Sequence, residues 1–567
     1  MKSCRPDSIF VLLAITSLGA TGCNSKLSAV MGQKKSGGAE ASDRSIRAVE
    51  SPLPEASPVP NPTPSGTPNP IPTIIPDPIS WKDCPTSLSL QEGTTFQAIG
   101  GTPPLQYSLV SGLGTIDAAS GVYRRAWSTV PGTIRVTDAL GVSADCGPVS
   151  LSAGIVQLGI PLTSGGDDNI GGMATDDQGN IYFSAVTAGS WPGFSANGGN
   201  DMILVKTDPV GRKLWAIQFG SSGADSAGHV RLSSDKQFIF VVGTVAGAVA
   251  TAPGLGGTDV FIGKFRTIDG SEIWKKVWGG AGNDSSLRLA VSSQGKVWIT
   301  GSTTDSVKNG VSNLGLKDAF LARFDGETGS EEFVDQVGTA SDEFGGESGG
   351  IAVAKNGDVV TMFRVGSPFL GDAYPGAYPS AIILRDAAGQ IKWKVPSQCT
   401  SGQDSGLDFA PDGAVLVLLN CTQAVTGATP PNTSPLYAMV SKLSVSDGSG
   451  IWVNEEGALG NNYTQGFAVG ADGAVFVASI SAGASYAGLP NPGGFSALMY
   501  KLTPDGQTQW RVFEGVPEVD YVFQPAILPS GDPVVVRNQC RHASSGWNPE
   551  DGGLCMEVRS AINGERI

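Results

Sequence analysis

A pattern that returns about every 59 residues limits the fold of this chain more than any other feature. An aromatic marker residue ends each unit, and it falls at Trp215, Trp274, Phe333, Trp393, Trp452 and Trp510. The steps between these markers are 59, 59, 60, 59 and 58 residues. A fixed period of this size is typical of solenoids, propellers and repeat arrays, in which each unit is one supersecondary element.

Each unit has the same order of segments. After the marker come a Gly-rich loop with an acidic residue, a short strand, a tight turn such as SSQGK and an apolar strand such as VWITGS. A variable loop, a strand such as DAFLARFD, a second turn and the next marker strand follow. Four strands per unit with no helical pattern predict the blade of a β-propeller. The 78 Gly and 37 Pro residues fit an all-β chain of short strands and tight turns.

The two ends of the repeat region predict how the ring closes. A seventh unit begins near Asp520 with strands in FQPAILP, PVVVRNQ and LCMEVRS, but it has no marker strand. An unassigned strand, GIVQLGIPL, precedes the first unit. We expect this strand to complete the last blade, which would leave no open sheet edge. The sequence therefore predicts a seven-bladed β-propeller over residues 154–567, closed by an N-terminal strand.

The third unit, GGAGNDSSLRLAVSSQGKVWITGSTTDSV…DAFLARFD, resembles the bacterial β-propeller repeat family known as SBBP. Units of that family read roughly G-G-S-G-N-D…A-V-D-S-S-G-N-V-Y-V-T-G…D-A-F-V-A-K…W. The first and second units also fit this pattern, and the later units fit it progressively less well. The resemblance implies the propeller fold. It implies no activity, because such repeats occur in surface and secreted proteins that share no single function.

Residues 1–22 have the pattern of a targeting signal, with a basic start, the apolar run IFVLLAITSL and small residues before Cys23. This resembles a bacterial lipoprotein signal and implies acylation of Cys23, with palmitate among the lipids. Asn24 favours the outer membrane in the enteric pattern, at the cell surface or the periplasmic face. Ala20 stands where Leu is commoner, so a secretory cut that leaves Cys23 free is the alternative. The lipid would be the protein's membrane attachment, because no other segment is long and apolar enough to span a bilayer.

Two regions separate this signal from the repeats. Residues 23–80 carry the anchor and a Pro-rich segment, PLPEASPVPNPTPSGTPNPIPTIIPDP, which predicts a disordered, extended stalk. Residues 81–153 alternate apolar and polar side chains between Gly and Pro turns. Their pattern PLQYSLVSGLGTIDAASGVYR…GTIRVTDALGVSA resembles bacterial Ig-like or cadherin-like domains, which implies a small β-sandwich that acts as a spacer.

Six cysteines remain after the signal and Cys23 are set aside, and sequence alone allows fifteen pairings. An even number in an exported chain predicts disulfides. Pairing neighbours within one module predicts the bonds Cys84–Cys146, Cys399–Cys421 and Cys540–Cys555.

An acidic or amide residue recurs in the loop after each marker. The series is Asp168, Asp225, Asp284, Asp342, Asp404, Asn462 and Asp520. One interpretation is an acidic mouth that holds a cation. We favour a structural role, in which each side chain accepts hydrogen bonds from the amides of its tight loop. Calcium requires six or more oxygens at one point, which a wide ring does not provide, so we expect no metal.

No catalytic pattern stands out. Residues 346–350 read GESGG, a G-x-S-x-G match without a strand-to-helix elbow. His229 and His542 have no evident nucleophile partner. The turns DGETGSEEF and TIDGSEIW are similar to a turn of quinoprotein propellers, without a cofactor constellation. We therefore expect no cofactor and no enzymatic activity. The alternative is a carbohydrate-active lyase or hydrolase that uses the mouth of the propeller.

The variable loops are the candidate binding surface. They carry the aromatic residues Trp191, Phe194, Tyr374, Tyr378, Tyr486 and Trp547 among Gly, Pro, Ser and Asn. Such residues on rigidly mounted loops suit protein or glycan recognition, although the loops could equally pack onto their blades. The net charge of −15 argues against nucleic acid. The predicted function is a monomeric binding or scaffold module, with an envelope assembly scaffold as a further alternative.

Overall fold

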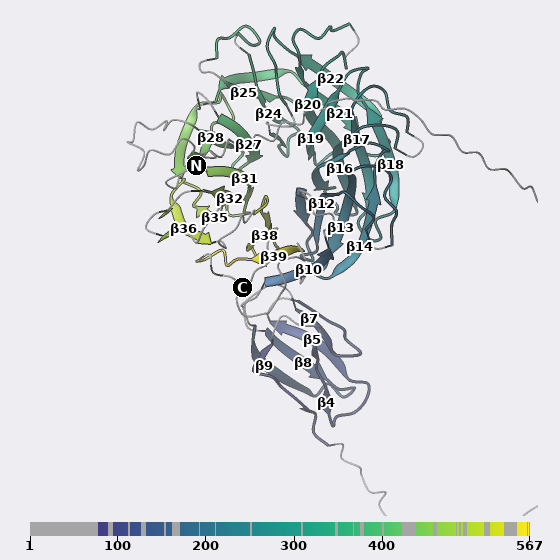
Figure 1. The fold of residues 1–567 in the computed structure, drawn as a ribbon. Helices are drawn as coiled ribbons and strands as arrows, with labels where there is room; N and C mark the ends of the chain where they lie inside the picture. Colours follow the sequence, from purple (N-terminus) through teal and green to yellow (C-terminus); the bar gives the residue numbers. More distant parts are fainter. Residues whose placement is uncertain are drawn as a thin grey trace, which may run out of the picture. The chain divides into compact units, whose positions relative to one another are not determined.

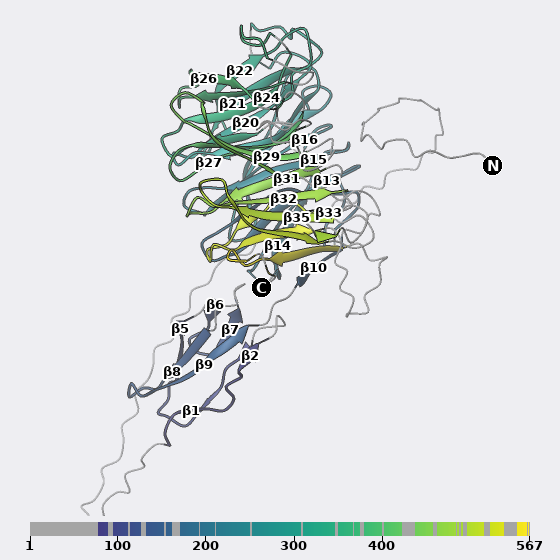
Figure 2. The same cartoon turned by 90° about the vertical axis from the view of Figure 1, so that its left-hand side faces the viewer.

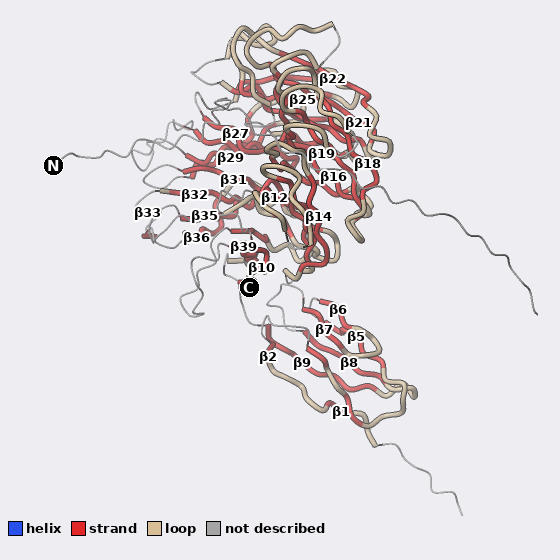
Figure 3. Tube along the Cα trace, turned by 45° about the vertical axis from the view of Figure 1, so that its right-hand side comes forward, coloured by secondary structure: helices blue, strands red, loops and turns tan. Residues whose placement is uncertain are grey.

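The computed structural model describes most of the chain from residue 77 to residue 565. Not described within that range are 89–93, 112–113, 126–131, 152–154, 162–169, 192, 210, 250–251, 308–309, 346–349, 367, 375–378, 398, 400–401, 422–436, 457–461, 483–484, 487–488, 491–495, 515–521, 538–552 and 564. The predicted signal, Cys23 and nearly all of the predicted stalk therefore lie outside the described residues. All regular secondary structure in the described part is β-strand (Figure 3). This part contains no helix long and apolar enough to cross a membrane.

Residues 170–514 form six four-stranded antiparallel sheets, each built from one repeat unit. The first three sheets are β11 (Ile170–Thr175), β12 (Ile181–Thr187), β13 (Asp201–Thr207) and β14 (Lys213–Phe219); β15 (Ser226–Leu232), β16 (Phe238–Val245), β17 (Asp259–Arg266) and β18 (Glu272–Trp278); and β19 (Asp284–Val291), β20 (Lys296–Thr303), β21 (Asp318–Asp325) and β22 (Glu331–Val337).

The next three sheets follow the same order. They are β23 (Ile351–Val353), β24 (Val359–Arg364), β25 (Ser380–Arg385) and β26 (Ile391–Pro396); β27 (Gly402–Phe409), β28 (Val415–Cys421), β29 (Tyr437–Leu443) and β30 (Gly450–Glu456); and β31 (Asn462–Val469), β32 (Val475–Ser481), β35 (Ser496–Leu502) and β36 (Thr508–Glu514). A small hairpin of β33 (Ser485–Tyr486) and β34 (Leu489–Pro490) lies in the β32–β35 connection.

One further sheet joins the two ends of the repeat region. Its strand order is β10 (Ile155–Pro161), β39 (Gly553–Val558), β38 (Pro533–Arg537) and β37 (Ala526–Ile527). Strand β10 pairs antiparallel with β39, and Val156 stands opposite Met556. The unassigned N-terminal strand thus pairs with the C-terminal unit, as the repeat count predicts.

The innermost strands β11, β15, β19, β23, β27, β31 and β37 each contact the next, and β37 also contacts β11. These contacts arrange the sheets in a ring (Figure 1). Glycines permit the close approach, since a Cβ on Gly228 would stand 2.6 Å from the Cα of Leu287 in the neighbouring sheet. Figure 2 shows the same sheets after a 90° turn. The predicted all-β, propeller-like fold is confirmed.

The hydrophobic core is divided among the boundaries between neighbouring sheets, which we call seams. At the first seam, Tyr182 and Leu204 of the first sheet pack against Val230 and Val241 of the second. At the seam between the last and the first sheet, Val534 packs in one cluster with residues of β12 and β13. The second and third strands of each unit therefore read as continuous apolar runs, because both of their faces are covered.

Residues 77–151 form separate small sheets. Their strands are β1 (Ser80–Trp81), β2 (Ser87–Leu88), β3 (Thr94–Thr95), β4 (Ala98–Ile99), β5 (Gln106–Ser111), β6 (Gly114–Ile116), β7 (Val122–Arg125), β8 (Gly132–Thr137) and β9 (Ser143–Leu151). A four-stranded sheet has the order β2-β9-β8-β5, and a three-stranded sheet has the order β3-β7-β6. Phe96, Tyr123, Ile134 and Val149 form their shared core.

Two of the three predicted disulfides are confirmed. Cys84 bonds to Cys146 with a Cα–Cα distance of 5.5 Å. Cys399 bonds to Cys421 with a Cα–Cα distance of 5.4 Å. Cys540 and the side chain of Cys555 lie outside the described part of the chain, so the third pairing stays a prediction.

Candidate functional site

The marker tryptophans make one hydrogen bond that recurs from seam to seam. The indole Nε1 of Trp215 donates to the carbonyl oxygen of Thr267 in the next sheet, at 3.0 Å. The same bond joins Trp274 to Gly326 at 3.1 Å, Trp393 to Val445 at 2.8 Å, Trp452 to Pro504 at 3.1 Å and Trp510 to Ala561 at 3.2 Å. The repeated Trp therefore fastens five of the sheets to their successors.

The accepting carbonyl lies in a tight turn whose glycine supports the indole. Gly270 has φ 73°, and a Cβ there would stand 2.9 Å from a ring carbon of Trp215. Only glycine takes this left-handed backbone without strain and also leaves room for the ring. A lysine opposite the Trp in the strand ladder adds a second donor, since Lys206 Nζ lies 3.0 Å from the same Thr267 oxygen.

The third seam departs from this arrangement because its marker is Phe333, which has no N–H to donate. Arg323 stands opposite Phe333 in the ladder, and its Nη1 donates to the Ala387 carbonyl of the next sheet. The guanidinium lies over the ring of Trp298, 5.1 Å from the centroid. An arginine thus takes over the role that an indole and a lysine share at the first seam.

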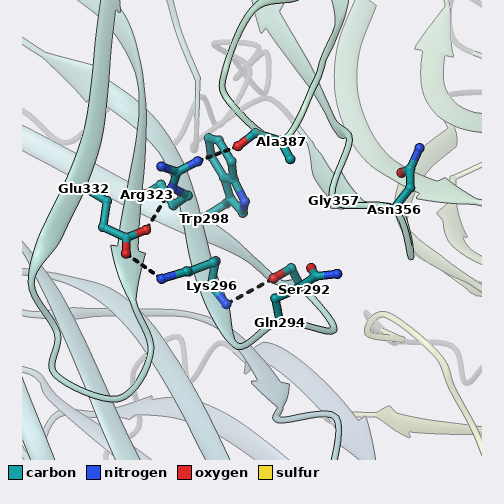
Figure 4. Close-up of a pocket in the computed structure, with 9 residues that line it drawn as sticks. All are labelled: Ser292, Gln294, Lys296, Trp298, Arg323, Glu332, Asn356, Gly357 and Ala387. Carbon is teal, nitrogen blue, oxygen red and sulfur yellow. Dashed lines mark hydrogen bonds and ion pairs between the residues drawn. The ribbon is translucent and has the colours of Figure 1, made fainter.

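A pocket of about 780 Å³ opens at this third seam, between the third and fourth sheets (Figure 4). Its lining residues are Ser292, Gln294, Lys296, Trp298, Arg323, Glu332, Asn356, Gly357 and Ala387. They come from β20, β21, β22 and the short turns β19–β20, β23–β24 and β25–β26. These turns lie at the end of the strands opposite the variable loops. The pocket is therefore on the other face from the predicted binding loops.

Charged side chains in and beside the pocket form a chain of three ion pairs. Lys296 Nζ pairs with Asp325 Oδ2 at 2.9 Å and with Glu332, whose other oxygen accepts from Arg323 Nε at 3.0 Å. Hydrogen bonds to Glu332 and Asp325 raise the pKa of Lys296, and the bond from Lys296 lowers the pKa of Asp325. Two cations thus face two carboxylates.

The rim of the pocket is polar and open to solvent. Gln294 and Asn356 are exposed and stand on two different turns. Each amide can donate and accept, whereas the ring of Trp298 is buried beneath Arg323. Sequence reasoning did not identify this site. The signal for it was the replacement of Trp by Phe at position 333, together with Arg323 where Lys206 and Lys264 occur in the earlier units.

The recurring loop acids that the structure describes accept backbone hydrogen bonds. Asp225 Oδ2 accepts from the Ser221 amide at 2.5 Å, and its Oδ1 accepts from the Ala246 amide at 3.2 Å. Asp284 Oδ2 accepts from the Gly280 amide at 2.6 Å. These bonds hold the two Gly-rich loops of Asp225 and Asp284 together.

In the fourth loop the residue with this role is Glu343 rather than the predicted Asp342. Glu343 is fully buried, and it accepts from the amides of Thr339 at 2.7 Å and Gly366 at 2.9 Å. Glu343 stands ten residues after its marker, as Asp225 and Asp284 do after theirs, so the glutamate has the same place in its loop. Asp342 is half-buried.

A second buried carboxylate faces each of these acids. The point where a Cβ on Gly220 would stand is 2.3 Å from Asp225 Oδ2 and 2.4 Å from Asp201 Oδ1. Burial raises the pKa of Asp225, and the charge of Asp201 adds to this shift. Burial likewise raises the pKa of Asp284 and of Glu343.

The remaining members of the acidic series are Asn462, Asp404, Asp168 and Asp520. Asn462 is buried at the start of β31. Asp404 lies in β27, opposite Leu419, but its side chain is outside the described part. Asp168 and Asp520 also lie outside the described residues.

The predicted exposure of the loop aromatics is wrong for Trp191 and Tyr374, which are 2% and 4% exposed. Trp191 packs in the core between the last and the first sheet, and Tyr374 packs edge-on against Phe369. Phe194 is partly buried against the same core as Trp191. Tyr378, Trp547 and the side chain of Tyr486 lie outside the described residues.

No protein-family model matches the chain. No curated protein matches it in sequence. Solved structures that it resembles include a quinohemoprotein alcohol dehydrogenase from Comamonas testosteroni, with 11% identity, a TM-score of 0.37, and coverage of 80% of this chain and 76% of that chain. The β-propeller domain of the Trilobed protease from Pyrococcus furiosus matches with 11% identity, a TM-score of 0.39, and coverage of 70% and 97%.

Acylaminoacyl peptidase from Pyrococcus horikoshii matches with 10% identity, a TM-score of 0.39, and coverage of 69% of this chain and 51% of that chain. At these identities and scores the likeness concerns the fold class and assigns no activity to this chain. It does correct one expectation. We expected the protein not to be an enzyme. That prediction is wrong, because the similar structures of this fold class include dehydrogenases and peptidases.

Proposed function

We propose that this protein binds a neutral, hydroxyl-rich ligand such as a surface glycan in the pocket at the third seam. The observation that carries the proposal is the pocket itself, which is large enough for a ligand and departs from the seam pattern of the other units.

The charge balance of the pocket supports a neutral ligand. Lys296 and Arg323 are already paired with Asp325 and Glu332, so a charged ligand would have to break an ion pair in order to find a partner. Sugar hydroxyls donate and accept at once, which matches the amides of the rim and the unused lone pairs of the carboxylates. Such contacts gain specificity because a ligand that lacks a partner leaves a polar group unpaired.

We place this pocket in a larger organisation that the sequence supports. The chain would be a bacterial outer-membrane lipoprotein acylated at Cys23, with a stalk over 23–80, an Ig-like domain over 81–153 and a seven-bladed SBBP-type propeller over 154–567. The ring of inner strands and the pairing of β10 with β39 support this number of blades. A stalked propeller would carry the pocket away from the membrane surface, where envelope glycans or proteins are accessible.

A glycan array probed with the mature protein, followed by calorimetric titration of the best glycan, tests the proposal. The variant Gln294→Ala/Asn356→Ala removes both rim amides and should weaken binding at least about tenfold. Gln237→Ala is the matched control, because Gln237 is an exposed amide in the corresponding β15–β16 turn. Each bound glycan is also incubated with the protein and analysed for cleavage, so that turnover is detected.

The proposal is supported if the double variant alone loses glycan binding. It is overturned if no glycan binds, or if both variants bind like the wild type. Capture of an envelope protein through the same two amides would assign the pocket to protein recognition in place of glycan recognition.

A further inference from the structure

Two arginines lie on innermost strands, next to the centre of the ring. Arg231 belongs to β15 and Arg288 to β19. Val230 packs into the core of the first seam. Because side chains alternate along a strand, Arg231 lies on the opposite face from Val230, and His229 lies at the register shift between Ala227 and Val230. Both guanidiniums are surrounded by protein, yet each arginine keeps part of its surface accessible.

His229 holds one of these guanidiniums in place. Its Nε2 is hydrogen-bonded to Nη1 of Arg288, across the boundary between the second and third sheets. Burial and the charges of Arg288 and Arg231 lower the pKa of His229 well below its usual value. The imidazole is therefore neutral, so that Nε2 accepts the bond. His229 positions Arg288 and adds no charge of its own.

Within the described part of the chain, the positive charge of the two arginines is only partly balanced. Among the described residues, neither Arg231 nor Arg288 forms an ion pair, and the Nε of Arg288 is buried without a partner. The carboxylate that acts on Arg231 is Asp408 of β27, at longer range, and its Oδ1 accepts from the Phe409 amide at 2.8 Å. Strands β15 and β27 belong to the second and fifth sheets, so this attraction acts across the ring.

Among the described residues, no carboxylate acts on Arg288 in this way. Burial and the charge of Arg231 lower the pKa of Arg288 to about 10. Keeping two guanidiniums close together inside a protein is costly unless negative charge compensates them. This occurs in a chain whose formal net charge is −15.

We propose that Arg231 and Arg288 form a binding site for an oxyanion, the carboxylate, sulfate or phosphate group of a small ligand, at the centre of the ring. A guanidinium presents parallel N–H donors that match two oxygens of such a group. The free Nε of Arg288 and its Nη2 are the fork that remains once Nη1 is bound to His229. The site differs from the third-seam pocket in chemistry, because that pocket is charge-balanced and this site is cationic.

Isothermal titration of the mature protein with inorganic phosphate, sulfate and succinate, at constant ionic strength, tests this site and distinguishes the three anions. The wild type should bind at least one of them at one site per chain. Arg288→Gln should weaken that binding at least about tenfold, and Arg288→Lys should have an intermediate effect because it keeps charge without the fork. Arg266→Gln, which changes an exposed arginine on β17, is the control and should bind like the wild type.

Thermal melting provides a readout that a purely structural arginine would not give. Without anion, Arg288→Gln should melt at the wild-type temperature or above it, because an uncompensated buried charge is removed. The anion-dependent rise of the wild-type melting temperature should be absent in the variant. The proposal is overturned if the wild type binds none of the three anions, or if Arg288→Gln retains the same affinity and the same rise in melting temperature.

Discussion

Gly329→Ala should destabilise the protein by disturbing the seam that Trp274 fastens. Gly329 has φ 69°, where an L-residue costs roughly 1–2 kcal/mol. The new Cβ would stand 3.0 Å from Trp274 Cε3, so the indole must shift. That shift lengthens the 3.1 Å bond from Nε1 to the Gly326 carbonyl, which is worth about 1 kcal/mol. The expected loss is about 2–3 kcal/mol.

Gly295→Ala is the matched control for backbone strain. Gly295 has φ 76° in the same sheet, and a Cβ there meets no atom within 4 Å. This variant should lose only the backbone part, roughly 1–2 kcal/mol. The difference between the two alanine variants isolates the contact with the indole.

A double-mutant cycle with Trp274→Phe completes the test. The free energy of unfolding is measured by urea denaturation followed by circular dichroism. Because the smaller ring leaves room for the Cβ, Gly329→Ala should cost about 1 kcal/mol less in the Trp274→Phe background, whereas Gly295→Ala should be additive with it. Equal losses for the two alanine variants, or additivity for both, would refute the role assigned to the glycine under the indole.

Three further predictions concern other parts of the ring. Burial raises the folded-state pKa of Asp284, so this group's contribution to stability is lost as pH rises above the unfolded value near 4 and through the folded pKa. Melting curves across that pH range should show the wild type losing stability relative to Asp284→Asn. A constant difference in melting temperature between the two proteins would contradict this. Phe333→Trp should place an indole N–H at the Ala387 carbonyl and raise the free energy of unfolding by about 1 kcal/mol. A lower free energy of unfolding in urea denaturation would count against the seam pattern. Cys399→Ser/Cys421→Ser should lower stability by about 3 kcal/mol, because the bond closes a loop with a sequence separation of 22, and an unchanged midpoint would show that this bond constrains little.

The repeat in the sequence was sufficient to predict the sheets, because each one is a local product of its own unit. Alternating turns and apolar runs place the four strands, and the marker Trp identifies where each unit ends. Even the pairing of β10 with β39 followed from counting strands, since an incomplete unit at one end and a spare strand at the other are complementary.

Features that depend on contacts between units were not predictable in the same way. Trp191 stands in a loop rich in Gly, Ser and Asn, and its burial depends on apolar residues such as Val534 from the other end of the chain. The role of Arg323 could likewise not be predicted, because it depends on where the Ala387 carbonyl of the next sheet lies. By contrast, the choice of Glu343 over the adjacent Asp342 could have been predicted, because Glu343 stands ten residues after its marker, as Asp225 and Asp284 do after theirs.

The pairing of β10 with β39 tests most directly whether the chain closes into a ring. Gln157 stands opposite Cys555 in this ladder, and paired residues of antiparallel strands are close enough for a disulfide. In a Cys540→Ser background, Gln157→Cys should form an intramolecular bond between residues 157 and 555 in the folded protein. Peptide mapping by mass spectrometry would detect it as a linked pair of peptides from the two ends of the ring. The closed ring predicts nearly complete linkage before unfolding, whereas two free thiols or crosslinked dimers would contradict it.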